Sequence, residues 1–287
     1  MRRAAWIPEQ RTAWIPERRT AERWSAVLRI AVLAVLTAVL AACGSDGATG
    51  TTVAEDASSD PLAGSIVVSA AASLTDVFAD IGDAFVAEHP GARVTFNVGS
   101  SGQLSSQILD GAPADVVAFA DVAPMEALAD ADLLAGEASI FARNQLVIVT
   151  KPGNPEGITG LADLADAGVV SLCAETAPCG AYAERALGTA GVTIPTDRIT
   201  RGQDVRATLT PVTEGDAVAA IVYVTDAVAA GDSVDRVEIP EADDVVAAYP
   251  IAVLAGSASM DVAVAFDEFV RSEAGQRILG DAGFLGP

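Results

Sequence analysis

Four short turns built mainly from small residues carry the clearest chemical signal in this chain. They are Ala71-Ala72-Ser73-Leu74-Thr75-Asp76, Gly99-Ser100-Ser101-Gly102, Ala177-Pro178-Cys179-Gly180 and Gln203-Asp204-Val205-Arg206. Each stands where a strand pattern gives way to a helix pattern. The first N–H groups of a helix lack partners within the helix and carry partial positive charge, so several helix starts aimed at one point form an anion site. The turns therefore favour an oxyanion-binding protein over an enzyme.

The spacing of apolar residues predicts the elements that position these turns. Strands are expected at 66–68, 93–98, 115–119, 145–150, 169–173, 219–224 and 249–254. Helices are expected from Ser73 to the stop at His89-Pro90-Gly91, and at 103–110, 122–134, 159–166, 178–190, 203–213, 225–230 and 261–280. The alternation favours an α/β fold with a mainly parallel sheet, in which binding sites lie at the carboxyl ends of strands.

The charge balance excludes several classes of partner. The chain of 287 residues has a net charge of −22. Residues 1–42 contain seven Arg and three Glu, so the remainder has 10 basic and 36 acidic residues and a net charge of −26. Such a surface repels nucleic acid and anionic lipid headgroups. An anionic ligand would have to be held by local dipoles in a cleft, because salt screens charges beyond ~10 Å.

The N-terminal segment has the pattern of an export signal. Residues 26–42 are apolar and follow an Arg-rich stretch, and their uncharged part, 30–42, has 13 residues. That length suits a signal peptide better than a membrane span. Leu40-Ala41-Ala42-Cys43 resembles the lipobox of bacterial lipoproteins, which implies cleavage before Cys43 and lipidation of its sulfur. The alternative is a Cys in an ordinary cleaved signal. We expect 1–42 to be the lipoprotein signal region and 43–63 a flexible tether.

A set of ordered segments carries a family resemblance over about residues 65–285. The segments are 70–75, Ser100-Ser101, 111–116, 145–149, 178–183, Asp204-Val205-Arg206 and 221–227. Together they resemble the periplasmic molybdate-binding proteins of ABC importers. The resemblance implies an α/β fold of the type II periplasmic-binding-protein kind, a two-lobed clamshell in which each lobe is a sheet flanked by helices. Lobe one would hold 64–142 plus 247–287, and lobe two would hold 143–246.

The same resemblance implies a ligand set made of neutral hydrogen-bond donors. Ser73 and Ser101 would contribute hydroxyl and N–H groups, Cys179 and Val205 their backbone N–H groups, and Tyr223 its phenol. A fully ionised dianion has no proton to donate, so a site made only of donors suits it. Without the resemblance, Ser73 could be only a helix N-cap that pairs with Asp76 in an S-x-x-D box, Ser101 part of a polar turn, and Tyr223 a core residue. Asp226 is expected to be a helix cap or a group behind the ligand contacts rather than a contact itself, since its carboxylate would repel a dianion.

The implied function is capture of molybdate, and of tungstate, for an ABC permease in the membrane. The two lobes would close around the oxyanion. Molybdenum would enter only as the bound oxyanion, and no cofactor is expected. The protein would be an exported monomer, anchored by lipid at Cys43 to the outer face of the cell membrane.

The two remaining cysteines favour a disulfide. Cys179 departs from the family pattern, in which a small residue such as Ala is common, although its N–H can still serve. Five residues separate Cys173 from Cys179, and export places both in an oxidising compartment. A disulfide is preferred over two free thiols or a metal pair. His89 is the only His, so a Cys/His metal site is not convincing.

Other functions are less well supported by the sequence. An enzyme would need a nucleophile and a base, and no G-x-S-x-G, H-E-x-x-H or P-loop pattern occurs. The same fold could bind another oxyanion, such as sulfate or phosphate. A third alternative is a module outside transport that no longer binds a ligand, which the presence of Ser73, Ser101 and Tyr223 disfavours.

Overall fold

The computed structural model describes residues 62–240 and 245–287. The predicted signal region, Cys43 and the tether up to residue 61 lie outside the described residues. Among the helices of the described part, none has the length and apolarity that crossing a membrane requires.

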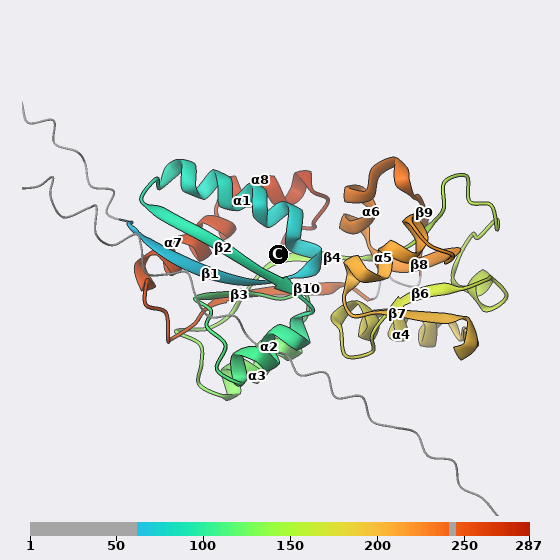
Figure 1. Cartoon of the computed structure of the whole chain (residues 1–287), viewed down its shortest axis with the longest axis horizontal. Helices are drawn as coiled ribbons and strands as arrows, with labels where there is room; N and C mark the ends of the chain where they lie inside the picture. Colours follow the sequence, from blue (N-terminus) through green and yellow to red (C-terminus); the bar gives the residue numbers. More distant parts are fainter. Residues whose placement is uncertain (1–61, 241–244) are drawn as a thin grey trace, which may run out of the picture. The chain divides into compact units, whose positions relative to one another are not determined.

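The first of two five-stranded sheets has the order β2-β1-β3-β10-β4. Its strands are β1 (Gly64–Ala71), β2 (Ala92–Gly99), β3 (Val116–Ala118), β4 (Ser139–Asn144) and β10 (Ala247–Val253). β1 pairs in parallel with β2 and β3, whereas β10 runs antiparallel to β3 and β4. The carboxyl ends of β1, β2 and β3 therefore meet at one edge (Figure 1).

Helices cover both faces of this sheet. α1 (Thr75–Glu88), α7 (Met260–Arg271) and α8 (Glu273–Asp281) pack together on one face, and α2 (Ser101–Leu109) and α3 (Val122–Asp130) on the other. The alternation of side chains along β3 divides the two cores: Val116 belongs to the first and Val117 to the second. Phe85 and Phe266 are fully buried in the first core, with ring centroids 5.3 Å apart.

The second sheet has the order β7-β6-β8-β5-β9. Its strands are β5 (Leu146–Thr150), β6 (Val170–Cys173), β7 (Ile199–Gly202), β8 (Ala219–Tyr223) and β9 (Asp235–Glu238). β6 pairs in parallel with β7 and β8, and β5 is antiparallel to β8 and β9. α4 (Pro178–Ala190) covers one face, and α5 (Val205–Thr213) and α6 (Val224–Ala230) cover the other (Figure 1).

Short 3₁₀ turns complete the described elements. They are η1 (Ala72–Leu74), η2 (Leu161–Ala165), η3 (Thr196–Arg198) and η4 (Gly231–Ser233). We call the first sheet with its helices lobe one and the second sheet with its helices lobe two. The predicted α/β class, with each lobe a sheet flanked by helices, is confirmed. The residue boundaries predicted for the lobes stay a prediction.

Several details of the sequence prediction were wrong. Both sheets are mixed rather than mainly parallel, because β5 and β10, the strands at which the chain passes between the sheets, run antiparallel to their neighbours. The predicted helix 261–280 divides into α7 and α8 at Ser272, whose backbone is extended and whose hydroxyl accepts from the Gly275 N–H at 3.3 Å. The predicted helix 122–134 ends at Asp130 and is followed by Asp132 at φ 56°. The segment expected to be a helix at 159–166 is the 3₁₀ turn η2.

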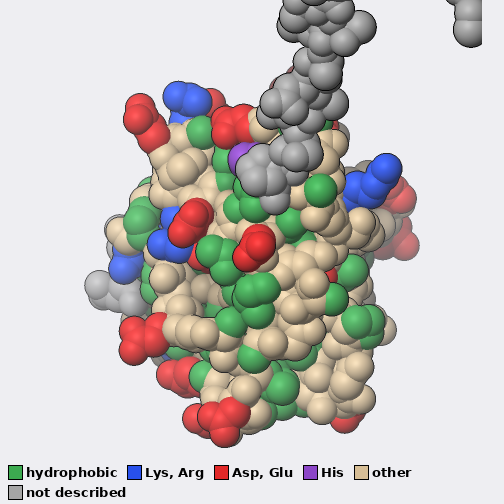
Figure 2. Space-filling model, turned by 90° about the vertical axis from the view of Figure 1, so that its left-hand side faces the viewer, with side chains coloured by type: hydrophobic (Ala, Val, Ile, Leu, Met, Phe, Trp, Pro, Cys, Tyr) green, Lys and Arg blue, Asp and Glu red, His purple; other side chains and the backbone are tan. Residues whose placement is uncertain are grey.

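The exterior of lobe one is acidic, as the composition indicates. Figure 2 shows Asp and Glu side chains distributed over one face of the molecule, separated by apolar and neutral polar groups. The charge is spread rather than gathered, so binding of an anion depends on the local chemistry of the site.

Candidate anion-binding site

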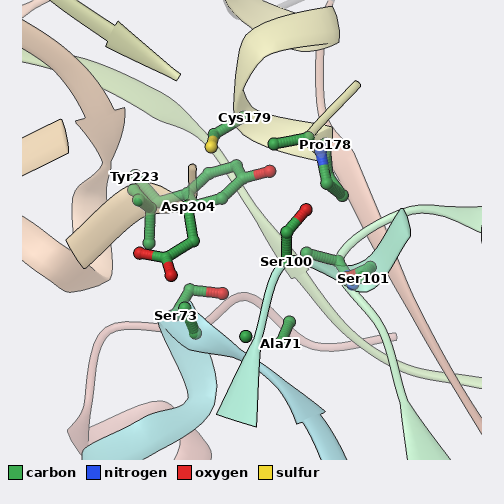
Figure 3. Close-up of a pocket in the computed structure, with 13 residues that line it drawn as sticks. Ala71, Ser73, Ser100, Ser101, Pro178, Cys179, Asp204 and Tyr223 are labelled. Carbon is green, nitrogen blue, oxygen red and sulfur yellow. Dashed lines mark hydrogen bonds between the residues drawn. The ribbon is translucent and has the colours of Figure 1, made fainter. Parts of the chain in front are cut away.

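Six strand ends supply the walls of a small pocket. β1, β2, β3, β6, β7 and β8 each lead into a helical segment, and these connections line a cavity of about 20 Å³. A cavity needs roughly 10–15 Å³ to hold one water, so this space suits a compact ion rather than a sugar or an amino acid. The predicted ligand residues all lie in the lining: Ser73, Ser101, Cys179, Val205 and Tyr223 (Figure 3).

Three of these residues stand in the first turn of a helix. Ser101 and Val205 are the first residues of α2 and α5, and Cys179 is the second residue of α4, after Pro178. Backbone N–H groups at these positions cannot bond to a carbonyl four residues earlier in the same helix. Each is therefore a donor at the positive end of a helix dipole. The lining thus has three such helix starts, from both lobes.

The expected capping role of Ser73 was wrong. Ser73 lies inside η1, the N-cap of α1 is Leu74, and neither makes a side-chain cap bond. Instead, Ser73 Oγ lies 2.9 Å from Tyr249 Oη in a buried contact. A 3₁₀ turn of three residues precedes α1, which moves the cap position beyond the serine and turns its hydroxyl inward.

The partners of Tyr249 allow its hydroxyl to donate to Ser73. Asn144 Oδ1 accepts from the Gln145 N–H at 3.0 Å, so its Nδ2 is the amide group that faces Tyr249 Oη at 3.4 Å. Asn144 is thus the donor to the phenol oxygen, and Tyr249 can give its proton to Ser73 Oγ. The proton of Ser73 is then free for the pocket. Sequence reasoning missed Tyr249 and Asn144, which come from β10 and β4.

The hydroxyl of Ser101 is oriented in a similar way. Ser101 Oγ accepts a hydrogen bond from the Ala120 N–H at 3.0 Å, and the residue is 1% exposed. An acceptor lone pair is thereby occupied, while the O–H proton remains available. Ser101 can therefore offer both its N–H and its O–H to a ligand.

Tyr223 places a buried hydroxyl group at the pocket. It is the last residue of β8 and the N-cap of α6, it is 1% exposed, and its buried Oη has no hydrogen-bond partner among the residues that the structure describes. The phenol extends into the pocket (Figure 3). Burial raises the pKa of this phenol well above its ordinary value of 10, so the group remains a donor at neutral pH. A buried donor without an acceptor costs about 1–3 kcal/mol, which a ligand oxygen would offset.

The acidic residues near the site have structural roles. Asp226 Oδ2 accepts from the Tyr223 N–H at 3.2 Å, which agrees with the capping role expected from the sequence. Burial raises the pKa of Asp226 to about 7, against the opposing effect of Arg206. Asp204, the one carboxylate in the lining, accepts from the Ala207 N–H at 2.9 Å as the N-cap of α5. No Lys, Arg or His is among the residues that line the pocket.

The cysteines of lobe two form a bond next to the pocket. A disulfide joins Cys173 at the end of β6 to Cys179 in α4, with Cα atoms 5.7 Å apart. Within the described residues, no cluster of three or more His, Cys, Asp and Glu side chains is arranged to hold a metal ion.

Polar contacts near the pocket join the lobes, and they include the hydrogen bond from Asn144 Nδ2 of β4 to Thr225 Oγ1 of α6 at 2.8 Å. Tyr182 of α4 donates to Asp121 Oδ1 at 3.2 Å, and burial together with Asp121 raises the pKa of Tyr182 to about 12. Arg206 of α5 forms an ion pair with Asp76 of α1. Arg206 Nε also lies 3.9 Å from the buried Asp226 Oδ1.

The fold and the site together define a class of protein. Two sheets flanked by helices contribute donors to one pocket, in the manner of a two-lobed substrate-binding protein for a compact anion. The family of bacterial extracellular solute-binding proteins matches residues 66–285, and the chain belongs to this family.

Individual relatives and solved structures agree with this family membership. The chain is 40% identical over 266 residues to the molybdate-binding protein ModA of Mycobacterium tuberculosis H37Rv, which covers 92% of this chain and 100% of the relative. The periplasmic molybdate-binding protein of Azotobacter vinelandii superposes with a TM-score of 0.69 at 19% identity, covering 77% of this chain and 99% of that one. The sulfate-binding protein SubI of M. tuberculosis gives a TM-score of 0.68 at 23% identity, covering 77% and 86%. At these identities the two structures show the fold alone.

Proposed function

We propose that this protein captures molybdate, and tungstate, outside the cytoplasm and delivers it to an ABC permease. The 40% identity to a molybdate-binding protein over the whole length of that relative supports the ligand. Membership of the extracellular solute-binding family supports a role in binding rather than catalysis. The proposal includes no cofactor and no reaction, because molybdate is the cargo.

The observation that carries the proposal is the unpartnered Tyr223 hydroxyl among neutral donors. Its buried oxygen shares the pocket with the helix starts at Ser101, Cys179 and Val205, and no cationic side chain is present in the lining. Such a set suits an anion that brings its full charge and no proton of its own. Molybdate and tungstate are dianions of this kind at neutral pH, and their similar size predicts that both bind.

The donors come from both lobes, which suggests how binding and delivery are coupled. Ser73 and Ser101 belong to lobe one, whereas Cys179, Val205 and Tyr223 belong to lobe two. Only a closed arrangement presents all of them to one anion, so the ligand stabilises closure. A permease that recognises the closed form would then receive loaded protein in preference to empty protein.

The cellular setting of the proposal rests on the sequence. The lipobox-like Leu40-Ala41-Ala42-Cys43 supports a lipid anchor at Cys43 on the outer face of the cell membrane. The acidic balance of the chain argues against nucleic acid as a partner. We propose a monomer tethered beside its permease.

Thermal unfolding of the purified protein with molybdate, tungstate, sulfate and phosphate in turn tests the function. A ligand at ~1,000 times its Kd adds about 4 kcal/mol of stability. For a protein of this size that corresponds to a rise in Tm of roughly 8–16 °C. Calorimetry is the suitable readout. All three Trp precede residue 43 and lie in the predicted signal region, so Trp fluorescence would not report on the folded part.

The four anions separate the proposed function from its alternatives. A rise in Tm with molybdate and tungstate alone supports the proposal. A rise with sulfate alone indicates a smaller pocket than proposed. A rise with phosphate, which keeps a proton near neutral pH, requires an acceptor, and Asp204 is the carboxylate in the lining that could serve. No rise with any anion contradicts an oxyanion-binding function.

A further inference from the structure

The disulfide in lobe two encloses one of the helix starts that line the pocket. Cys173 is the last residue of β6, and Cys179 is the second residue of α4, so the bond closes the connection between strand and helix. Cys173 is 0% exposed and Cys179 is 3% exposed, and Cys179 lines the pocket. The bond is therefore attached to a residue that lines the pocket and whose N–H belongs to the first turn of α4.

The connection between β6 and α4 is folded tightly against its surroundings. Ala174 donates its N–H to the Gly202 carbonyl at 2.7 Å, and Ala177 donates to the Ala174 carbonyl at 2.9 Å. A Cβ at Gly180 would lie 2.1 Å from the Ala174 carbonyl oxygen, so the helix start approaches the strand end as closely as backbone atoms allow. A small shift of this connection would displace the Cys179 N–H.

The disulfide also contacts the neighbouring helix start. Thr208 Oγ1 lies 3.2 Å from Cys173 Sγ and 2.8 Å from the Asp204 carbonyl oxygen, to which it donates. Thr208 follows Val205 by one helical turn in α5. The sulfur therefore packs against the turn that carries the Val205 N–H.

We propose that the Cys173–Cys179 disulfide positions the anion-binding N–H groups of lobe two, holding Cys179 directly and the start of α5 through Thr208. The inference rests on the proposed function of the pocket. It assigns the bond a role in affinity, beyond its contribution to stability. Without the bond, the connection samples conformations in which these N–H groups point away from the ligand.

The test is a double variant that removes the bond and keeps every backbone donor. Cys173→Ala/Cys179→Ala retains the N–H of residue 179, and Cys43 is unchanged in all samples. If the binding-competent fraction falls to about a tenth, the apparent Kd rises roughly tenfold. Titration calorimetry with molybdate at a temperature well below the Tm of each protein measures this change, and stopped-flow kinetics should show faster ligand dissociation.

A matched control separates positioning from stability. Leu187→Ala removes a buried side chain from the far part of α4, away from the pocket, and lowers stability without touching the site. We expect its Kd for molybdate to equal that of the unchanged protein. If Leu187→Ala weakens binding as much as the cysteine double variant does, the disulfide acts through general stability and the inference fails.

Reduction of the unchanged protein provides a second route that needs no substitution. Excess dithiothreitol donates two electrons and two protons to the disulfide, giving two thiols and oxidised dithiothreitol. Circular dichroism establishes that the reduced protein is folded. We expect weaker molybdate binding after reduction and full recovery after reoxidation. Equal affinity in both states overturns the inference, whereas an oxidised protein that binds no molybdate overturns the proposed function instead.

Discussion

At the scale of single residues, the site is defined by hydroxyl groups whose protons are available to a ligand. Tyr223 Oη is buried and has no acceptor among the described residues. Ser101 Oγ already accepts from Ala120, and Tyr249, whose oxygen accepts from Asn144, can donate to the oxygen of Ser73. In each case the remaining proton is free for a ligand. Because these donors are neutral hydroxyl groups, they can replace the water shell of an anion without a positively charged side chain.

Tyr223→Phe should reduce molybdate affinity while leaving the fold intact. A hydrogen bond to a charged group contributes about 1.5–3 kcal/mol, so Kd should rise by roughly 10- to 150-fold. The ligand-free variant should be more stable than the unchanged protein, by up to about 1–3 kcal/mol, because the lost hydroxyl is a buried donor with no partner in the described residues. Titration calorimetry measures the affinity, and thermal unfolding measures the stability.

Tyr249→Phe gives the contrasting case for stability, because the ring remains and a paired hydroxyl is lost. Tyr249 Oη contacts Ser73 and Asn144, so its removal should lower the stability of the ligand-free protein. Equal Kd values for Tyr223→Phe and the unchanged protein would show that the Tyr223 hydroxyl is not a ligand contact.

Asp226 should give the stability of the protein a distinct pH dependence. Burial raises its pKa from 3.8 to about 7 in the folded state, so the folded protein binds the proton more tightly than the unfolded chain does. The associated stability is fully present below pH 4 and is lost as the pH rises to 7, with a slope of at most about 1.4 kcal/mol per pH unit.

Asp226→Asn isolates this effect, because Asn keeps the oxygen that accepts from the Tyr223 N–H. The variant should gain stability relative to the unchanged protein as the pH is raised from 5 to 8. Urea unfolding at several pH values measures the difference. A difference that is constant over this range would mean that Asp226 is ionised throughout.

At the scale of elements, the site follows from strands that end at one edge and continue as helices. The small residues at 71–73, 99–102 and 177–180 permit close turns, and this made the helix starts predictable from sequence. The capping of α1 was not predictable in the same way, because a 3₁₀ turn of three residues shifts the helix start past Ser73. The contribution of Tyr249 was also missed, since the contact joins residues 176 apart in the chain.

The strands that were missed are all edge strands. β4, β7 and β9 stand at the ends of their sheets, and each carries polar residues along a half-exposed surface. An edge strand buries less apolar area than a central strand, so its sequence lacks the apolar run that revealed β5 and β8. Hydrophobic pattern therefore predicts the centres of these sheets better than their borders.

Gly180→Ala tests the close approach of α4 to β6. The added Cβ would lie 2.1 Å from the Ala174 carbonyl oxygen, so the backbone would have to move. We expect a loss of about 1–3 kcal/mol of stability and weaker molybdate binding. Gly188→Ala, in the same helix with no atom within 4 Å of the new Cβ, should instead gain roughly 0.5–1 kcal/mol. Denaturant unfolding compares the two, and a neutral Gly180→Ala would contradict the packing described.

At the scale of the whole molecule, the two lobes are joined by polar contacts between their side chains. Arg206 of lobe two pairs with Asp76 of lobe one, and Tyr182 of lobe two donates to Asp121 of lobe one. Both contacts lie beside the pocket rather than within it. These contacts can stabilise the closed arrangement of the lobes without changing which ligand the pocket recognises.

Asp76→Asn should speed ligand release by a modest factor. The side chains of Arg206 and Asp76 are 34% and 61% exposed, and pairs of this kind contribute about 0.2–1 kcal/mol, so the dissociation rate should rise by roughly 1.5- to 5-fold. Salt should reduce the difference between variant and unchanged protein. Asp83→Asn, an exposed position on the same helix, is the control and should leave the rate unchanged. Stopped-flow measurements that show no difference between the two variants would exclude a contribution from the ion pair.

A crystal structure of the protein grown with molybdate, with an anomalous map at the molybdenum edge, tests the central claim most directly. The account predicts one molybdenum peak in the pocket, with ligand oxygens within hydrogen-bond distance of Tyr223 Oη and of the Ser101, Cys179 and Val205 N–H groups. A peak held elsewhere by Lys or Arg side chains, or a pocket that remains without molybdenum at saturating ligand, would contradict it.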